Sequence, residues 1–331
     1  MAARLRNIDL INNCDAFPDP VTEPDKYAAQ MQQIYTLVFE DGEGQLPIGY
    51  MLKWVLDKII EVPDDVKGYC KVDDGNRTVS MFREATEPER TRRATTLTQY
   101  LRDNHTFRLL AGWRDELWPV YGRDGKIIFS VERAAMGLFG NTRYGVHMTA
   151  YVPSPADSYG IKIWVPTRAA TKLTYPGMLD NTVAGGLMTG EDPFECIIRE
   201  ADEEASLPDP LVRGNAKMVG NVSYIYLTDA RSGGEDGYIY PEVQWVYDLE
   251  LPVDVVPAPK DGEVESFSLL TIDQCKERLA LGLFKPNCAL VMLDFFVRHG
   301  ILTPENEPHY EDIRRRVRRK LPFPGPHEHF Y

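Results

Sequence analysis

The sequence predicts an α+β protein of two domains, and three observations support this fold class. The chain has 331 residues, of which 43% are apolar, and this is enough material for two hydrophobic cores. Apolar residues follow mainly helical spacing before Gly145 and mainly strand-like runs after it, and helical spacing returns near the C-terminus. We therefore expect a smaller α+β domain over residues 1–144 and a larger domain with a mixed sheet over residues 145–331.

The first domain is expected to begin with helices. Apolar residues recur every three or four positions over residues 27–38, 48–60 and 97–110, which predicts three helices. Residues 64–93 are polar and rich in charge, and the run 126–132 has the composition of a strand. Because no catalytic motif lies in this part of the chain, we expect it to form one wall of a substrate cleft and to limit substrate choice.

The second domain is expected to contain a sheet followed by helices. Runs dense in β-branched and aromatic residues predict strands over residues 146–152, 162–168, 218–227, 243–251 and 263–270. Segments containing Gly or Pro separate these runs. Apolar spacing then predicts helices over residues 272–283, 289–298 and 310–319.

The charge and the cysteines disfavour several classes of protein. Lys and Arg total 37 against 50 Asp and Glu, so the formal net charge of -13 argues against nucleic acid and anionic membranes as partners. The five cysteines are scattered and form no CxxC pair, which is typical of reduced intracellular thiols. The first residues lack the apolar core of a secretory signal, so we expect a cytoplasmic protein, with the nucleus as an alternative. The oligomeric state stays open.

The chemistry concentrates in residues 185–207. Asp192 is a favourable N-cap and Pro193 a favourable first helical residue, so a helix is expected to start here. Glu195 stands where a capping box places its acid.

Three acids share one face of this expected helix. Glu200, Glu203 and Glu204 stand at positions i, i+3 and i+4, and therefore lie within about one turn. Their charges repel one another, and a hard cation such as Mg²⁺ compensates because it takes oxygen ligands and leaves positions for phosphate. The alternative is a solvated acidic face, which is the usual meaning of an isolated acidic run.

The frame around these acids resembles the Nudix box, GX5EX7REUXEEXGU, where U is a bulky aliphatic residue. The matching positions are Gly185, Glu191, Arg199, Glu200, Glu203, Glu204 and Leu207. Two positions depart from the pattern, because Ala201 is small and Ser206 replaces the usual glycine. The resemblance implies a Nudix α/β/α sandwich with a mixed sheet and the hydrolysis of a diphosphate.

The resemblance also implies roles for the matching residues. Glu200, Glu203 and Glu204 would coordinate Mg²⁺ or Mn²⁺, together with the carbonyl group of Gly185. The remaining charged positions, Arg199 and Glu191, would orient these acids. An ordinary surface ion pair is the alternative for Glu191.

Nudix enzymes often use a further acid from outside the box. The segment DGEVESF offers Asp261, Glu263 and Glu265, of which Glu263 is our first choice. A simple turn or strand-edge carboxylate is the alternative for each. Either a box glutamate or Glu263 would accept the proton from the attacking water.

A longer resemblance covers the chain from about residue 20 to the C-terminus. Residues 111–121, 131–140, 144–152, 163–186, 247–252, 261–267 and 285–305 look like the Nudix module that is fused to some fungal thiamine pyrophosphokinases, and like its separate fungal and plant relatives. This resemblance implies a small-molecule diphosphate as substrate, namely thiamine pyrophosphate or its oxidised forms. The products would be the monophosphate and inorganic phosphate.

The segment just before the box supplies candidates for substrate binding. Arg168, Lys172, Tyr175 and Asn181 could contact the diphosphate or the heterocycle. A solvent-facing strand end is the alternative for Arg168, and turn formation is the alternative for Asn181. We expect His147 to be a structural histidine with satisfied hydrogen bonds rather than a general base.

Three alternatives to this function remain open. The organic group could be that of a nucleoside-diphosphate derivative or an isoprenoid diphosphate, because the box recognises only the diphosphate. The chain could also be a non-catalytic binding module with a Nudix fold. Finally, residues 314–320 contain six basic residues in seven, and these could form a nuclear or nucleic-acid signal, although an acid-paired helix face is the expected role of such a run.

Overall fold

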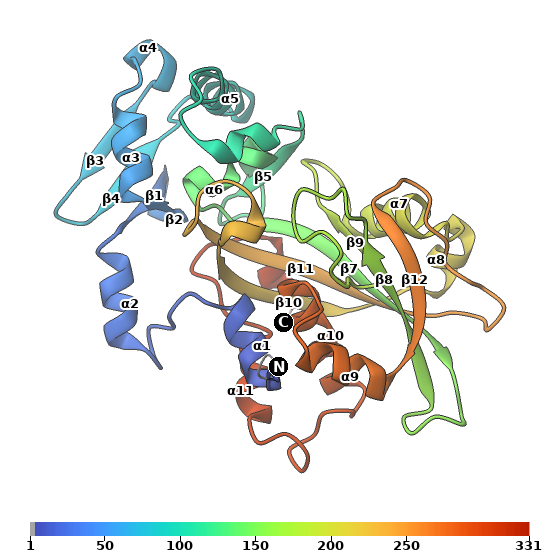
Figure 1. Ribbon diagram of the computed structural model, residues 1–331. Coiled ribbons are helices and arrows are strands. Elements are labelled where there is room, and N and C mark those ends of the chain that lie inside the picture. The colour runs from blue at the N-terminus through green and yellow to red at the C-terminus, as the bar shows by residue number, and fades with distance from the viewer. Residues whose placement is uncertain (1–3, 331) are drawn as a thin grey trace.

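The structure is a computed structural model that describes residues 4–330, and its N-terminal region is built on a four-stranded sheet (Figure 1). The strands are β1 (Ile34–Asp41), β2 (Gly44–Leu52), β3 (Cys70–Asp73) and β4 (Thr78–Met81), in the order β2-β1-β4-β3. The helices are α2 (Pro24–Met31), α3 (Lys53–Ile60), α4 (Asp64–Lys67), α5 (Glu87–Asp103) and α6 (Met136–Phe139). A hairpin of β5 (Leu117–Tyr121) and β6 (Ile127–Glu132) completes the region, with the 3-10 helices η1 (Arg108–Gly112) and η2 (Arg133–Ala135) beside it.

A larger mixed sheet forms the centre of the C-terminal region. Its strands are β7 (Arg143–Pro153), β8 (Ile161–Arg168), β9 (Val183–Gly186), β10 (Lys217–Leu227), β11 (Ile239–Glu250) and β12 (Val264–Thr271). The order is β10-β11-β7-β8-β12, with β9 paired to β7. Strand β7 runs parallel to β11 and antiparallel to β8, so the sheet is mixed. The predicted α+β class, with a mixed sheet after a separate N-terminal α+β region, is confirmed.

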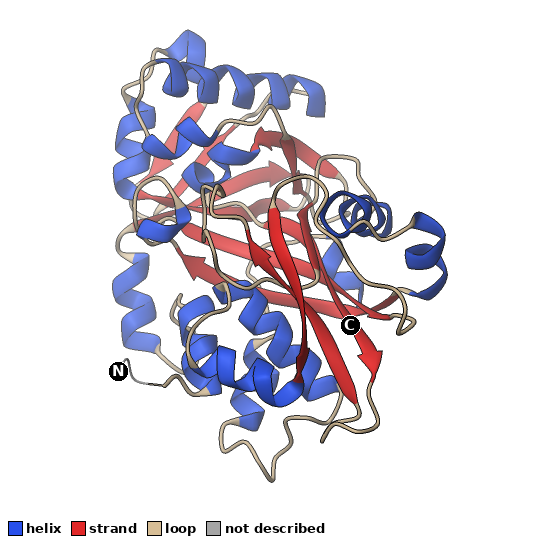
Figure 2. Ribbon diagram, turned by 45° about the vertical axis from the view of Figure 1, so that its right-hand side comes forward, coloured by secondary structure: helices blue, strands red, loops and turns tan. Residues whose placement is uncertain are grey.

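Helices cover both faces of this sheet (Figures 1 and 2). One face carries α7 (Pro193–Ala205), with α8 (Asp209–Asn215) beside it. The other carries α1 (Asn7–Cys14), α9 (Ile272–Ala280), α10 (Pro286–Arg298) and α11 (Tyr310–Arg316). The 3-10 helix η4 (Pro326–Phe330) is the last element of the described residues. The first helix, α1, packs against α9, α10 and α11, so a segment near the start of the chain lies beside the C-terminal helices.

Two of the predicted helices are wrong. Residues 27–38 contain the end of α2 and the start of β1, and residues 48–60 contain the end of β2 and all of α3. Both faces of β1 and β2 are largely buried, so their apolar residues do not alternate and resemble helical spacing. Pro47 does not start a helix, because it lies where the pairing of β1 and β2 shifts register, a position that tolerates a missing N–H.

The β5–β6 hairpin joins the two regions beside the box. The backbone N–H of Thr189 donates to the carbonyl oxygen of Leu117 (2.8 Å), and its hydroxyl donates to Ser130 (2.9 Å). The Trp118 ring lies directly against Gly186, where any side chain would overlap it. The loop that leads into α7 is therefore held by the N-terminal region.

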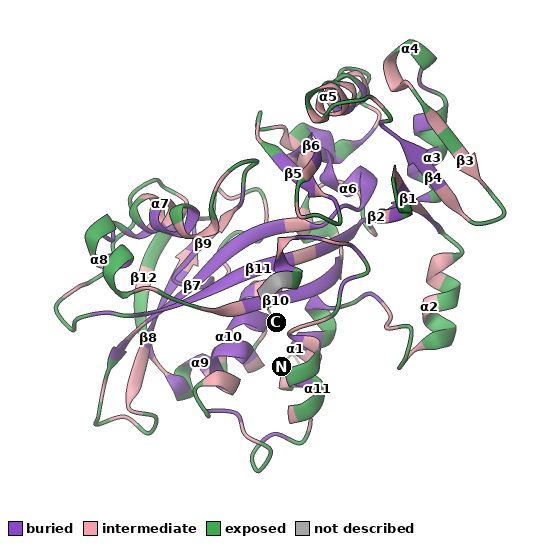
Figure 3. Cartoon of the chain, turned by 180° about the vertical axis from the view of Figure 1, so that it is seen from behind, coloured by how far each residue is buried: buried purple, intermediate pink, exposed green. Residues whose placement is uncertain are grey.

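Burial in the large sheet is deepest along β7, β11 and the second half of β10 (Figure 3). Trp245 and Tyr247 on β11 are 1% and 2% exposed, so both belong to the core. No helix among residues 4–330 combines the length and the apolar character needed to cross a bilayer.

Candidate active site

Helix α7 begins where the sequence predicts. Asp192 caps the helix by accepting hydrogen bonds from the backbone N–H groups of Phe194 and Glu195 at 2.8 and 3.2 Å. The predicted helix start is confirmed. The capping-box role of Glu195 is wrong, because its carboxylate forms an ion pair with Arg213 of α8 at 2.7 Å.

The exit of α7 keeps a left-handed turn although the usual glycine is absent. Ser206 adopts φ 54° and ψ 29°, a conformation that glycine adopts more easily than other residues. Its hydroxyl donates to the carbonyl oxygen of Ala258 at 2.9 Å, which holds the turn against the loop before β12. The departure from the box at Ser206 therefore leaves the helix exit intact.

Glu200 faces strand β9 at close range. A Cβ atom at position 185 would overlap the Glu200 carboxyl group, so glycine is required opposite this acid. The Glu200 side chain is only 15% exposed. Burial raises the pKa of Glu200 to about 7, although the nearby Arg199 opposes this shift. Without a cation, this carboxyl group is therefore partly protonated at neutral pH.

Glu204 stands one turn further along the same face. Its carboxylate accepts a hydrogen bond from the backbone N–H of Ala184 on β9 at 3.1 Å. Removal from water, reinforced by the negative charges of Asp180 and Glu200, raises the pKa of Glu204 well above its usual value. The two acids Glu200 and Glu204 thus lie at the edge of β9 with too little positive charge around them.

Arg199 ties the remaining acids of the box together. Its guanidinium group donates to Glu191 at 2.9 Å and to Glu203 at 2.8 Å, and it lies 3.0 Å from Glu200. The Glu191 side chain is 15% exposed, so this contact is not an ordinary surface ion pair. One arginine among three acids neutralises the cluster only in part.

The further acid, Glu263, comes from the start of β12. Its negative charge contributes to the raised pKa of Glu200, which places it beside the box acids. The Lys172 ammonium group forms an ion pair with the Glu263 carboxylate. Burial acts to raise the pKa of Glu263, but Lys172 outweighs it and holds the pKa below its usual value. The neighbouring Asp261 instead accepts the backbone N–H of Glu263 at 2.8 Å and shapes the turn.

Arg168 and Tyr175 contact protein groups in this structure. Arg168 is 8% exposed and donates to Asp180 at 2.6 Å and to the carbonyl oxygens of Thr174 and Tyr175. It is therefore buried, not solvent-facing, and it holds the loop between β8 and β9. The Tyr175 hydroxyl lies 2.7 Å from the hydroxyl of Tyr226.

Asn181 belongs to a buried polar cluster with His147, Asp180 and Cys288. The Asn181 side-chain oxygen lies 2.8 Å from Nδ1 of His147, which is 3% exposed. Burial lowers the pKa of His147 to about 4, so the imidazole is neutral and has the structural role that the sequence predicts. The Cys288 thiol donates to Asp180 at 2.6 Å.

The sequence alone does not predict that these buried residues form one cluster. Ligand atoms of His147, Asp180 and Cys288 lie within 4.8 Å of one another, so this set could hold a metal ion. A nitrogen, oxygen and sulfur set favours zinc-like ions over Mg²⁺. The three residues come from β7, from the loop before β9 and from α10, and no local spacing in the sequence connects them.

The box acids, by contrast, fit a hard divalent cation. Glu200, Glu203, Glu204 and Glu263 supply only oxygen ligands, and the Glu200 carboxyl group lies against the backbone at Gly185. Burial and neighbouring negative charges raise the pKa values of Glu200 and Glu204, and a bound cation would reverse that penalty. The arrangement thus defines a hydrolase of the kind that acts on phosphate anhydrides with a divalent metal.

Comparison with known proteins agrees with this class. The NUDIX domain family matches residues 154–288, and a domain of unknown function, DUF4743, matches residues 50–143. The chain belongs to the Nudix superfamily, with a DUF4743 domain ahead of the Nudix domain, and this places it in the Nudix class of pyrophosphatases. Nudix hydrolases generally use divalent metals.

Several relatives cover most of the chain. The uncharacterized protein YJR142W of Saccharomyces cerevisiae is 36% identical over 96% of this chain and 92% of its own length. Nudix hydrolase 20, chloroplastic, of Arabidopsis thaliana is 37% identical over 78% of this chain, which spans 63% of the length of that plant protein. Among solved structures, DR0079 of Deinococcus radiodurans is 21% identical over 54% of this chain and 98% of its own, with a TM-score of 0.38.

Proposed function

We propose that the chain hydrolyses thiamine pyrophosphate or, preferentially, its oxidised forms to the monophosphate and inorganic phosphate, with Mg²⁺ or Mn²⁺ as cofactor. In this reaction the oxygen of a water molecule bonds to phosphorus and the phosphoanhydride bond breaks. The observation that carries the proposal is the group of three glutamates on one face of α7, two of which have raised pKa values. Such a group is costly for a protein that binds no cation.

We assign a separate role in this reaction to each of the acids. Glu200, Glu203 and Glu204, with the Gly185 carbonyl group, would hold the cation, which supplies the positive charge that stabilises the phosphate oxygens as the anhydride bond breaks. Because its pKa is held low, Glu263 is a carboxylate at neutral pH and can add a ligand or accept a proton from water.

The surrounding charges position these acids. Arg199 contacts three box acids and fixes their orientation, while Glu191 anchors Arg199 from the other side. Lys172 is the predicted substrate-binding residue nearest to the acids, because it pairs with Glu263. In our proposal it exchanges this partner for a phosphate oxygen when substrate enters.

The choice of a thiamine compound rests on the long resemblance to the Nudix module of fungal thiamine pyrophosphokinases. Two of the similar segments, residues 163–186 and 285–305, contain the loop before β9 and helix α10, which contribute Asp180, Asn181 and Cys288 to the buried cluster. We propose that this side of the site contacts the organic group, and that the N-terminal region walls the opposite side and limits substrate choice.

A substrate screen tests this proposal. Release of phosphate is measured with Mg²⁺ or Mn²⁺ from thiamine pyrophosphate, its oxo- and oxy- forms, nucleoside-diphosphate derivatives and isoprenoid diphosphates, and the products are identified. We expect the highest kcat/KM for the oxidised thiamine compounds. Hydrolysis of only the nucleotide or prenyl compounds would overturn the substrate, while hydrolysis of none would favour a binding module.

A second test compares a glutamine variant of a box acid with a matched control variant. Glu204→Gln removes an acid that faces β9, whereas Glu265→Gln removes an exposed acid two residues from Glu263. A hydrolase loses turnover in the first variant and keeps it in the second. Equal ligand affinity in both variants, without turnover in the native chain, would fit a binding module.

A further inference from the structure

The cations closest to the box acids are already paired. Arg199 contacts three acids, Arg168 pairs with Asp180, and Lys172 pairs with Glu263. A diphosphate brings further negative charge to this place. A bound divalent cation offsets only part of it, so a free cation from another element would favour binding.

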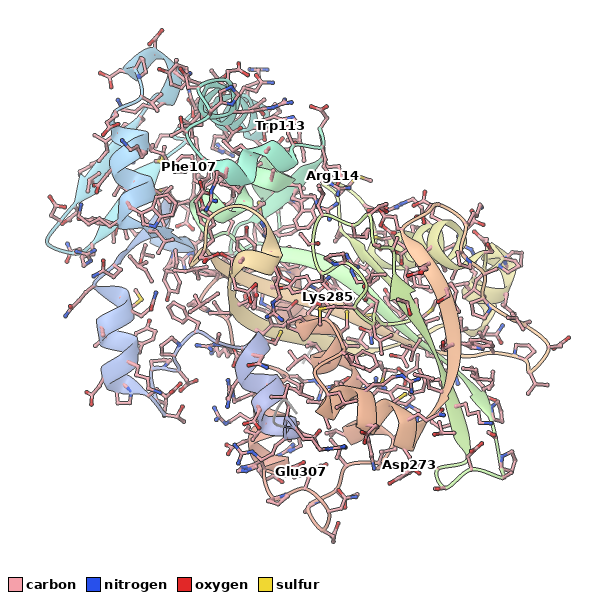
Figure 4. The ribbon with its side chains drawn as sticks, viewed as in Figure 1. Phe107, Trp113, Arg114, Asp273, Lys285 and Glu307 are labelled. Atoms are coloured by element: carbon pink, nitrogen blue, oxygen red, sulfur yellow. The ribbon has the colours of Figure 1, made fainter. Side chains whose placement is uncertain are left out.

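Arg114 is such a cation, and it belongs to the N-terminal region. It lies between η1 and β5, and Figure 4 shows it on the side of that region that faces the loops of the Nudix domain. Within residues 4–330 its exposed guanidinium group has no hydrogen bond or ion pair. Its positive charge nevertheless reaches Glu263 and helps to lower the pKa of that acid, so it lies close to the site.

The turn that carries Arg114 is firmly built. The buried carboxylate of Glu132, which is 2% exposed, accepts the backbone N–H of Arg114 at 3.0 Å. The next residue, Asp115, adopts φ 60° and accepts the indole N–H of Trp113 at 2.8 Å. These two contacts fix the backbone from which the Arg114 side chain extends.

The same turn is fixed to the Nudix domain on both sides. After it, the Leu117 carbonyl oxygen accepts Thr189 N–H at the loop before α7. Before it, the carboxylate of Glu235, from the loop between β10 and β11, accepts the backbone N–H of Arg108 at 2.6 Å. Arg114 is therefore held at a set distance from the box acids.

The Lys285 side chain likewise forms no hydrogen bond or ion pair within residues 4–330, although its backbone N–H donates to the carbonyl oxygen of Leu179. It precedes α10 at the opposite side of the site, and its charge lowers the pKa of Asp180 (Figure 4). The charge of Lys285 thus compensates a buried acid. The charge of Arg114 is not needed in this way, because the nearby acid Glu263 already forms an ion pair with Lys172.

We propose that Arg114, contributed by the DUF4743 domain, binds a phosphate group of the substrate, so that the active site is shared between the two domains. This inference rests on the proposed diphosphate hydrolysis. Arg114 is exposed, positively charged and held on a rigid turn, and its planar group can donate two parallel hydrogen bonds to a phosphate. Removal of the positive charge of Arg114 should therefore weaken phosphate binding while metal binding is kept.

The test compares Arg114→Gln and Arg114→Lys with Arg92→Gln, which removes an exposed arginine from α5 of the same domain. Binding of methylenediphosphonate, a diphosphate that cannot be hydrolysed at its bridge, is measured by calorimetry with Mg²⁺ present, and Mg²⁺ binding is measured alone. We expect Arg114→Gln to raise the Kd of the probe by about tenfold or more and leave Mg²⁺ binding unchanged. Arg114→Lys should restore part of the affinity, and Arg92→Gln should behave as the native chain.

Kinetics separate this inference from the proposed function. Arg114→Gln should raise KM for the best diphosphate substrate by a similar factor and change kcat less. A probe Kd within about twofold of the native value would overturn the role of Arg114 while leaving the hydrolase intact. If the native chain hydrolyses no diphosphate, the proposed function fails, and the probe Kd still decides whether Arg114 binds phosphate.

Discussion

Two runs of like charge in this chain differ in how far other protein groups neutralise them. The acids of α7 lie against β9 with one arginine among them, and the pKa values of Glu200 and Glu204 are raised. The basic run 314–320 begins in α11, on the other face of the large sheet, and within it five arginines each pair with an acid. The two runs look equally unusual in the sequence.

The basic run acts as a structural clamp. Arg316 and Arg319 both pair with Asp15, which is 3% exposed, at 3.2 and 2.8 Å. The same two guanidinium groups also donate to backbone carbonyl oxygens of residues 15–18. The run thus fastens the segment after α1 to the C-terminal helices, which is the acid-paired role expected from the sequence. Removal of one partner from such buried pairs destabilises the fold, whereas acids with raised pKa values are candidates for a functional site.

The largest effect should come from the clamp. Asp15→Ala leaves two largely buried arginines without their carboxylate, and we expect the free energy of unfolding to fall by about 3 kcal/mol or more. Urea unfolding of the native chain and the variant measures this difference. Asp15→Asn retains an acceptor for the Ile225 N–H, which Asp15 binds at 3.1 Å, and should lose less. A loss below about 1 kcal/mol would place the clamp among ordinary surface pairs.

A histidine that burial keeps neutral, although Asp180 lies close to it, should make stability depend on pH. Because burial lowers the pKa of His147 from 6.5 to about 4, the unfolded chain binds a proton between these pH values that the folded chain does not. Stability from this group is therefore complete above pH 6.5 and falls as pH decreases toward 4, by about 3 kcal/mol in total. His147→Gln should lack this component in the difference between urea curves at pH 7 and pH 4.5. An imidazole that titrates near 6.5 by NMR would contradict the prediction.

The acids of α7 should respond to metal rather than to a protein partner. At about 100 times its Kd, Mg²⁺ should stabilise the native chain by about 2.7 kcal/mol, because it binds only the folded state. Glu204→Gln should gain less than about 1 kcal/mol at the same concentration, since the affinity is reduced. Thermal unfolding with Mg²⁺ and with a chelator measures both values, and Glu265→Gln is the control. Equal stabilisation of Glu204→Gln would remove Glu204 from the metal ligands.

The contrast between the two runs also shows which features of the fold and the site can be predicted from the sequence alone. The box spacing identifies α7, its N-cap and its acids, because these features are local and repeat within a few residues. Alternating or β-branched runs likewise locate the strands β7, β8, β10, β11 and β12. The strand β1 is missed, because burial on both faces removes the alternation that marks a strand.

Features that join distant segments are not predictable in this way. Asp15 lies 301 residues before Arg316, and His147 lies 34 residues before its partner Asn181. The same holds for Arg114, whose approach to Glu263 depends on how the β5–β6 hairpin docks beside the box. These contacts depend on the tertiary fold, which no local spacing encodes.

The smallest effect should come from a pair that belongs to the basic run but lies on its surface. Arg315 and Asp312 are 3.4 Å apart, and their side chains are 49% and 58% exposed. Water screens such a pair and its formation orders two side chains, so Asp312→Asn should change the free energy of unfolding by less than about 0.5 kcal/mol. The measurement is the same urea titration as for Asp15→Ala. A loss comparable to that of Asp15→Ala would mean that the charge of the whole run, rather than the two buried pairs, holds the C-terminal helices in place.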